Sequence, residues 1–307
     1  MYARKFFATI IFLMILSGVL YADEWTSDKF DQRKAIQNDN TPPSRLKPLN
    51  NLEPLKNDEG VIRRVKIQSD EKFVALTFDM CELDTGTTGC DMEVINFLRE
   101  KKIPATFFMG GKWMRTHSRR VKQIMSEEIF EIGNHNWSHG NCALLSEDGL
   151  RAQILWTQAE YELLREETGF ENINAVPKLF RLPYGRNSEK SLKIISDLGL
   201  RIIQWDVAAE AGDNTNIKTA KRNAKKVAAI TKSGSILLFH ANLVPKGTAN
   251  LIKELIKILK SQGYEFFTVS ELLQLGEPEC VRIGYFNRPG DNVYLDKKFG
   301  TYGTGLK

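Results

Sequence analysis

The sequence predicts an α/β fold with a mainly parallel sheet and helices outside it, either closed as a (β/α) barrel or open as a doubly wound sheet. Three observations lead to this prediction. Apolar strand-like runs alternate with amphipathic stretches about seven times between residues 72 and 275. Glycines follow several of the amphipathic stretches, where they favour helix ends. Polar residues come directly after the apolar runs, as they do in barrels whose sites lie at one edge.

The N-terminal half of this alternation predicts three strands and three helices. The strands are expected at residues 73–78, 105–109 and 129–133, and the helices at 91–101, 116–126 and 146–168. Gly169 follows the longest helix as its stop signal.

The C-terminal half continues the same rhythm. Strands are expected at residues 178–180, 201–205, 235–239 and 265–269, and helices at 188–198, 216–232 and 248–261, with a short helix at Ser270. The tail at 276–307 lacks this rhythm, and we expect it to wrap over the surface.

The N-terminus has the features of an export signal. Arg4 and Lys5 precede an apolar run at residues 6–20, and Ala22 supplies a small residue for cleavage. The run is short for a spanning helix, although an uncleaved anchor is the alternative. We therefore predict a signal peptide at 1–22, an exported protein that is periplasmic or secreted, and no stable membrane span after cleavage.

Residues 23–70 form a polar extension, in which Pro42 and Pro43 mark a linker or an extended arm. The predicted organisation is then a signal at 1–22, an N-terminal extension at 23–70, an α/β domain at 71–275 and a C-terminal tail at 276–307.

The composition is that of an ordinary globular protein, with 42% hydrophobic and 26% charged residues. A net charge of +5 is too mild to indicate nucleic acid as a partner, and the basic run at 218–226 is expected to be a solvated helix face. Export makes disulfides the expected state of Cys81, Cys90, Cys142 and Cys280, with the pairing left open. A structural Cys₂His₂ zinc site is the alternative, but no C-x-x-C pair supports it.

Polar side chains follow the apolar runs at the point where each run ends. These are Asp79, His135, Arg181, Asp206 and His240. Because the carboxyl ends of parallel strands meet at one edge of a barrel, we expect these residues to assemble a site there. His139 lies four positions after His135, and two neutral imidazoles so spaced can bind one cation such as Zn²⁺.

These residue types together predict metal-assisted hydrolysis of an amide or ester. His135 and His139 would hold a metal, and a carboxylate would complete three protein ligands and leave one position for water. Asp79 would act as general base and His240 as general acid. Arg181 would keep the Asp79 carboxylate ionised and oriented.

Four segments resemble, in order, the successive motifs of the polysaccharide deacetylase (NodB-homology) family. They are TFD at 77–79, HNWSH at 135–139, RLPYG at 181–185 and LLFH at 237–240. The resemblance covers residues 72–275, roughly two thirds of the chain. It implies a distorted (β/α) barrel, a divalent metal that is usually Zn²⁺, and a polysaccharide substrate. The implied reaction removes N-acetyl groups from an N-acetylglucosamine polymer such as peptidoglycan or a chitin-like chain, or sometimes removes O-acetyl groups.

The resemblance also implies roles for individual residues. Asp79 matches the base and Arg181 the residue that orients it. His135 and His139 match the metal ligands, and His240 matches the acid. The backbone N–H of Tyr184 matches the oxyanion donor, a group that stabilises a tetrahedral intermediate.

The first departure from the family concerns the third metal ligand. The family has a second, metal-binding Asp directly after the base, and this chain has Met80, whose thioether is a poor ligand for zinc beside imidazoles. A carboxylate from the following loop could substitute, namely Glu82, Asp84 or Asp91. We favour Asp91, which also has the position of a helix N-cap.

The second departure follows Trp205, where the family's further Asp and Trp are missing. Asp206, Glu210 or Asp213 could partner His240, and we favour Asp213.

Two tryptophans inside motif stretches, Trp137 and Trp205, are expected to offer flat faces to sugar rings, although aromatic residues near strand ends often belong to the core. Two other functions remain open besides an exported deacetylase. One is a carbohydrate-binding pseudoenzyme without a complete metal site, and the other is a hydrolase of small N-acyl amides.

Overall fold

The computed structural model describes residues 25–27, 31–32, 41–57, 60–83, 86–170 and 173–303. The predicted signal peptide at 1–22 lies outside them. Within the described ranges, no helix combines the length and the apolar character that crossing a bilayer requires.

Seven strands close into the barrel. They are β1 (Val61–Lys66), β2 (Lys72–Met80), β3 (Ala105–Met109), β4 (Phe130–Asn134), β5 (Leu179–Phe180), β6 (Arg201–Ile203) and β8 (Ser235–His240). They follow one another in the order β1-β6-β5-β4-β3-β2-β8, with parallel neighbours, and a single pairing of Arg64 with Ser235 joins β8 back to β1. The predicted distorted (β/α) barrel is therefore confirmed.

Three further strands extend this barrel at its sides. β7 (Val207–Ala208) pairs with β8, β9 (Tyr264–Phe267) pairs with β2, and β10 (Glu277–Val281) lies antiparallel to β1.

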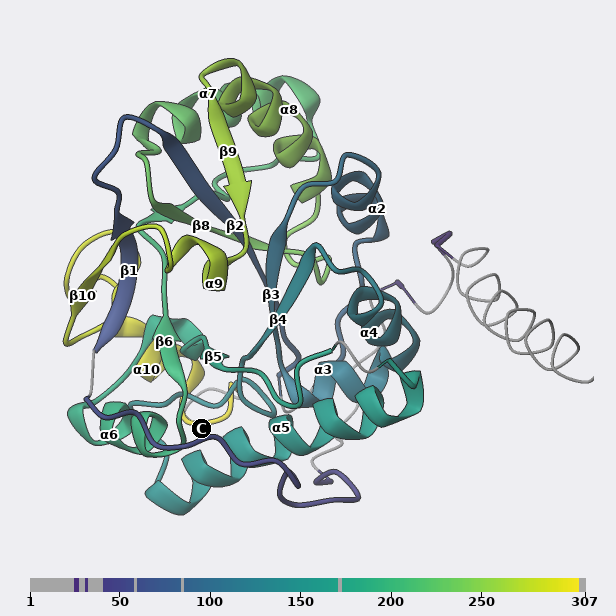
Figure 1. The fold of residues 1–307 in the computed structure, drawn as a ribbon, viewed down its shortest axis with the longest axis vertical. Helices are drawn as coiled ribbons and strands as arrows, with labels where there is room; N and C mark the ends of the chain where they lie inside the picture. The colour runs from purple at the N-terminus through teal and green to yellow at the C-terminus, as the bar shows by residue number, and fades with distance from the viewer. Residues whose placement is uncertain are drawn as a thin grey trace, which may run out of the picture.

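Helices cover the outside of the barrel (Figure 1). They are α2 (Met92–Glu100), α3 (Gly111–Thr116), α4 (Ser118–Met125), α5 (Glu147–Thr168), α6 (Glu189–Asp197), α7 (Ile217–Ile230), α8 (Thr248–Ser261), α9 (Val269–Leu272) and α10 (Tyr294–Phe299). The helix predicted at 116–126 is α4, and His117 separates it from α3, which the sequence analysis missed. α5 begins after Ser146, whose hydroxyl accepts from the N–H of Gly149, and ends at Gly169 in the left-handed conformation. α7 and α8 pack together at one end of the molecule, and the basic residues of α7 are exposed as expected.

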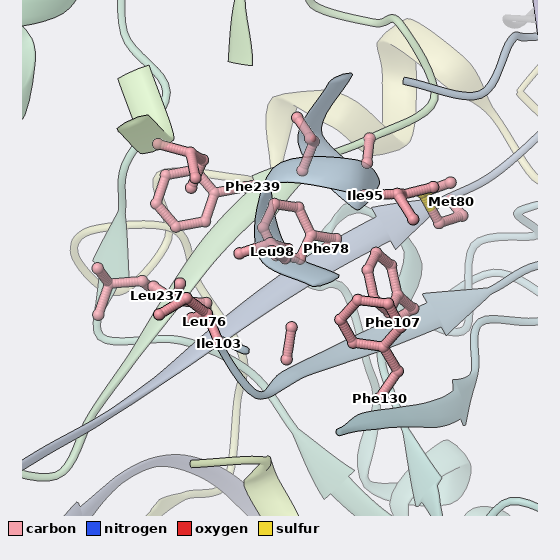
Figure 2. Packing of buried hydrophobic residues seen from close by; sticks show 14 of the residues in the cluster. Leu76, Phe78, Met80, Ile95, Leu98, Ile103, Phe107, Phe130, Leu237 and Phe239 are labelled. Carbon is pink, nitrogen blue, oxygen red and sulfur yellow. The ribbon is translucent and has the colours of Figure 1, made fainter. Parts of the chain in front are cut away.

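The residues of β2 alternate between two environments. Leu76, Phe78 and Met80 belong to the large core between the barrel and α2, where Phe78 stacks on Phe107 at 5.2 Å (Figure 2). Because successive side chains of a strand point to opposite faces, Asp79 points away from this core. The same alternation directs Met80 into the core, where its thioether is buried.

Strand β1 lies within the predicted extension at 23–70, and the sequence analysis missed it. The adjacent charges of Arg63 and Arg64 hide its apolar pattern, although Arg63 itself is buried. Its guanidinium lies over the ring of Tyr285 in the C-terminal tail, 3.7 Å from the ring centroid. β1 thus ties the tail to the barrel through Arg63 as well as through β10.

Candidate active site

Residues from several strands meet at a cavity of about 370 Å³ at the carboxyl-terminal edge of the barrel. Asp79 at the end of β2 and His240 at the end of β8 are paired neighbours in the sheet, and both line the cavity. Cys81, His139 and Tyr184 line it as well. The strand register therefore brings Asp79 and His240 together, as the sequence analysis expected. Asp206 does not join them, because its carboxylate accepts from the hydroxyl of Ser235 and the N–H of Ile236 at the start of β8.

Arg181 holds one oxygen of Asp79 from within the barrel. Its Nη1 donates to Asp79 Oδ1 at 3.0 Å, its Nη2 to Thr77 Oγ1 at 3.0 Å and its Nε to the carbonyl of Ile203 at 2.9 Å. Burial lowers the pKa of Arg181 to about 10, although Asp79 partly offsets this effect, so the guanidinium remains charged at neutral pH. The second carboxylate oxygen of Asp79, Oδ2, is left to face His135 at 3.6 Å from Nε2.

The two histidines lie next to each other, with ring centroids 4.8 Å apart. His135 Nδ1 donates to the carbonyl of Arg181 at 2.9 Å, which fixes the tautomer and leaves the Nε2 lone pair available. Burial lowers the pKa of His135 to about 3, and burial together with His135 lowers the pKa of His139 well below its ordinary value. Both imidazoles are therefore neutral, which is the form that binds metals.

His139 has a backbone conformation that is unusual for a residue with a side chain. Its φ is +59°, and Asn136, at the start of the same turn, has a φ of +61°. The Asn136 amide donates to the carbonyl of Gly140 at 2.9 Å and so closes the turn around His139. Strain of this kind persists where the surroundings enforce it, and it concentrates at functional sites.

A metal-binding group of described residues is present at the cavity, and it contains Cys81 together with His135 and His139. One ligand atom from each lies within 4.8 Å of the other two. Buried nitrogens of both histidines, His135 Nε2 and His139 Nδ1, have no hydrogen-bond partner. Two imidazoles and a sulfur are a donor set that zinc accepts, so these residues fit such a metal.

The structure also corrects the disulfide prediction for two of the cysteines. Cys81 and Cys142 carry free thiols. Burial and the charges of Asp79 and Glu82 raise the pKa of the Cys81 thiol above its ordinary value, and burial raises that of Cys142 to about 12.

The carboxylates that we expected to replace the missing ligand are held elsewhere. Asp91 is the N-cap of α2, and its side chain accepts from the N–H of Val94 at 3.3 Å. Glu82 accepts from the N–H of Thr88 at 3.1 Å and from the hydroxyl of Thr116 at 2.9 Å. The metal-binding group contains neither of them, so the preference for Asp91 does not hold, and Asp84 lies outside the described residues.

Glu210 is the carboxylate that partners His240, in place of the Asp213 that we favoured. His240 Nδ1 donates to Glu210 Oε2 at 2.7 Å, and the hydroxyl of Thr248 donates to Glu210 Oε1. Asp213 is exposed, and its carboxylate accepts from the N–H and the hydroxyl of Thr215. Burial would lower the pKa of His240, but Glu210, with help from Asp79, raises it above the ordinary value.

Tyr184 lies in a short 3₁₀ turn, Pro183–Gly185, directly after β5, and its φ is +59°. Within the described ranges, nothing accepts a hydrogen bond from its backbone N–H. Its ring lies against His139, with centroids 4.4 Å apart. The peptide N–H next to the histidine pair is thus available to a ligand.

The C-terminal tail supplies one wall of the cavity, which the sequence analysis missed. Phe286, Tyr294, Leu295 and Phe299 line it. Phe299 stacks on Tyr184, with ring centroids 5.0 Å apart and 15° between the planes. The tail is therefore part of the site and not only a surface wrap.

Polar contacts fasten this wall to the barrel. The Asn292 amide donates to the carbonyls of Tyr184 at 3.1 Å and of Gly185 at 2.9 Å. Asp296 accepts from Arg186 at 2.8 and 2.7 Å. Because these contacts reach the turn that carries Tyr184, they position the wall relative to the histidine pair.

The two tryptophans that we expected at the substrate lie in different surroundings. Trp205 lines the cavity and packs on Phe286 with centroids 5.1 Å apart. Trp137 is buried outside the cavity lining, between Trp156 and the guanidinium of Arg115, which lies 4.9 Å from its ring centroid. Trp137 therefore supports the turn between the histidines, and Trp205 lies at the cavity although it is only 2% exposed.

Sequence comparison identifies relatives over most of the barrel. The family described as polysaccharide deacetylase matches residues 66–203. A peptidoglycan-N-acetylglucosamine deacetylase from Bacillus cereus is 31% identical over 212 residues, which are 68% of this chain and 92% of that protein. The peptidoglycan-N-acetylglucosamine deacetylase PgdA of Listeria monocytogenes is 33% identical over 71% of this chain, but the match spans only 42% of PgdA.

Comparison of structures identifies a relative that is named as a pseudoenzyme. A pseudoenzyme of the CE4 carbohydrate esterase family from Bacillus anthracis superposes with a TM-score of 0.56 at 25% identity, covering 70% of this chain and 71% of that one. Both deacetylases and a protein named as a pseudoenzyme therefore share this fold.

Proposed function

Because the chain belongs to the polysaccharide deacetylase family, we propose that it is a metal-dependent hydrolase that removes N-acetyl groups from an N-acetylglucosamine polysaccharide, either peptidoglycan or a chitin-like polymer. The observation that carries this proposal is the meeting of Asp79, the histidine pair and His240 around one cavity. A general base, a metal-binding pair and a general acid at one edge are the groups that amide hydrolysis needs.

His135 and His139 would hold a divalent metal, most simply Zn²⁺, which supplies Lewis-acid activation of water and carbonyl when bound. Asp79 accepts the proton of the attacking water at Oδ2, because Oδ1 is occupied by Arg181. The water oxygen adds to the acetyl carbonyl carbon. The backbone N–H of Tyr184 donates to the carbonyl oxygen as that oxygen gains charge.

The second half of the reaction needs an acid. His240 donates a proton to the amide nitrogen as the carbon–nitrogen bond breaks, which leaves acetate and a free amine on the sugar. Glu210 holds Nδ1 of His240, so the opposite ring nitrogen faces the cavity that His240 lines. Trp205 and the aromatic residues of the tail supply apolar faces for the sugar.

The proposal includes export to the periplasm or the medium, where such polymers occur. It rests on Arg4 and Lys5 before the apolar run at 6–20.

A second candidate is a carbohydrate-binding pseudoenzyme. It is favoured by Met80, which stands where the family's metal-binding Asp is expected, and by the similarity to the Bacillus anthracis pseudoenzyme. Metal content separates the two candidates, since only the enzyme requires a bound metal.

The test is acetate release by the purified, zinc-loaded protein from peptidoglycan, chitooligosaccharides and small N-acetyl amides. We expect release from a polymer or oligosaccharide, loss of that release in Asp79→Asn, and its retention in the control Asp213→Asn, because Asp213 is exposed and its carboxylate binds Thr215. Absence of release from every substrate would favour the pseudoenzyme. Release from small amides alone would indicate a different hydrolase.

A further inference from the structure

We propose that Cys81 is the third protein ligand of the metal, in place of the carboxylate that the family uses. The inference rests on the proposed function for its metal, but not on turnover. Cys81 follows β2 directly, two positions after Asp79. An extended chain returns to the same face every second residue, so residue 81 is the next position after Asp79 on the face opposite the Met80 core.

The distances allow a shared metal. The ligand atoms of Cys81, His135 and His139 all lie within 4.8 Å of one another. Bond lengths of about 2.3 Å to sulfur and about 2.0 Å to nitrogen place tetrahedral ligand atoms roughly 3.5 Å apart. Side-chain movements on the order of an ångström therefore convert this arrangement into a metal site.

Each histidine of the pair has a buried nitrogen without a hydrogen-bond partner. His135 is almost fully buried, at 1% exposure, and its Nε2 has no hydrogen-bond partner. Since Nδ1 is engaged by the carbonyl of Arg181, the unpaired Nε2 must be an acceptor, and a buried acceptor without a partner is costly. A cation at this point would satisfy Nε2 of His135, and the neighbouring His139 also has an unpartnered nitrogen, Nδ1.

The carboxylates of Glu82 and Asp91, which follow Cys81, make their contacts elsewhere, and Asp79 is engaged at one of its oxygens. One oxygen of Asp79 is held by Arg181, while Glu82 binds Thr88 and Thr116 and Asp91 caps α2. Cys81 is the cysteine among the described residues that both lines the cavity and belongs to the metal-binding group.

Asn242 supports the sulfur from the other side. Its amide donates to the carbonyl of Cys81 at 3.1 Å and lies 3.6 Å from Sγ. Its backbone carbonyl accepts from the N–H of Gly89 at 3.0 Å, which fixes Asn242 against the loop. Donors to a ligating atom orient it and are typical of metal sites.

A thiolate changes which metals the site selects. Sulfur ligands favour zinc and other thiophilic ions, whereas carboxylates also suit magnesium, calcium and manganese. The thiol releases its proton when the metal binds, so the metal–sulfur bond replaces the sulfur–hydrogen bond. We therefore expect zinc or cobalt to bind and magnesium to be excluded.

The experiment uses cobalt as a spectroscopic probe. The purified protein is loaded with Co²⁺, and the near-ultraviolet absorption band of a sulfur-to-cobalt charge transfer is recorded with the bound metal content. The variants are Cys81→Ser, Cys81→Asp and the control Cys142→Ser, whose thiol is buried and lies outside the metal-binding group. Far-ultraviolet circular dichroism checks that each variant folds.

We expect the band and one bound metal in the wild-type protein and in Cys142→Ser. Cys81→Asp should bind cobalt without the band. Cys81→Ser should lose the band and weaken zinc binding by more than about 100-fold, because loss of an outer-shell partner alone costs 10–100-fold. A wild-type protein that binds no metal, a loaded protein without the band, or a band that persists in folded Cys81→Ser would each overturn the proposal.

This outcome is separable from that of the proposed function. A metal-bound protein with the band but without acetate release would retain Cys81 as ligand and reject the deacetylase. Acetate release by a metal-bound protein without the band would support the deacetylase and reject Cys81 as a ligand.

Discussion

The pair of His240 and Glu210 gives a prediction whose size can be worked out. Glu210→Gln keeps the length of the side chain and a hydrogen bond to Nδ1, which is 2.7 Å from the carboxylate in the structure, but removes the charge. A hydrogen bond to a charged group contributes about 1.5–3 kcal/mol and a neutral one about 1 kcal/mol. The protonated form of His240 therefore loses roughly 0.5–2 kcal/mol, and at about 1.4 kcal/mol per unit its pKa falls by about 0.5–1.5 units.

The sign of the effect on the rate follows from the role of His240. Glu210 and Asp79 raise its pKa against burial and the charge of Arg181, and the protonated form is the one that donates to the leaving amine. The rate should fall as pH rises above this pKa, so Glu210→Gln should move the alkaline limb of kcat/KM to lower pH. The assay is acetate release from chitooligosaccharide across the neutral and alkaline range, with Asp213→Asn as control. An unmoved limb in Glu210→Gln, or an equal shift in the control, would refute the assignment.

Three further predictions concern residues around this centre. Arg181→Met leaves the Asp79 carboxylate buried without its cation, so we expect a loss of about 3–5 kcal/mol in the free energy of unfolding by urea; an unchanged unfolding midpoint would contradict it. Asp91→Ala removes the N-cap of α2 and should lower the free energy of unfolding by about 0.5–2 kcal/mol, while the amount of bound zinc stays constant. A fall in bound zinc would show that Asp91 is a metal ligand. Phe299→Ala removes the stack on Tyr184, which is worth about 0.5–1.5 kcal/mol, so kcat/KM should fall by roughly 2- to 10-fold; unaltered kinetics would show that this wall does not contact substrate.

Long apolar runs were the part of the fold that the sequence predicted well. β2 and β8 lie where continuous apolar runs placed them, because both faces of each strand are buried. The helix α8 lies where its periodicity placed it, because one face of it is buried in the core. β1 was missed because two adjacent arginines interrupt its pattern, and one of them is buried against the tail. The burial of Arg63 depends on partners in the tail that lie more than 200 positions away, and a local sequence pattern does not contain them.

The sequence predicted Asp79, the histidine pair and His240, but it did not predict the carboxylate that binds His240 or the third metal ligand. Glu210 and Asp213 are three positions apart, so spacing could not choose between them. Gly212, with a φ of +67°, lies between them, and beyond it Asp213 is exposed. For the third ligand a usable signal existed, because the alternation of β2 continues from Asp79 to Cys81.

The chemical groups of the site and the wall formed by Phe286 and Phe299 come from different parts of the chain. The region that matches the family ends at residue 203, whereas this side of the cavity is built almost a hundred positions later. Protein that ends at residue 275 would keep Asp79, the histidine pair and His240 but would leave this side of the cavity open. Change in the ligand that the cavity accepts can accordingly accumulate in the last few dozen residues while the barrel stays as it is.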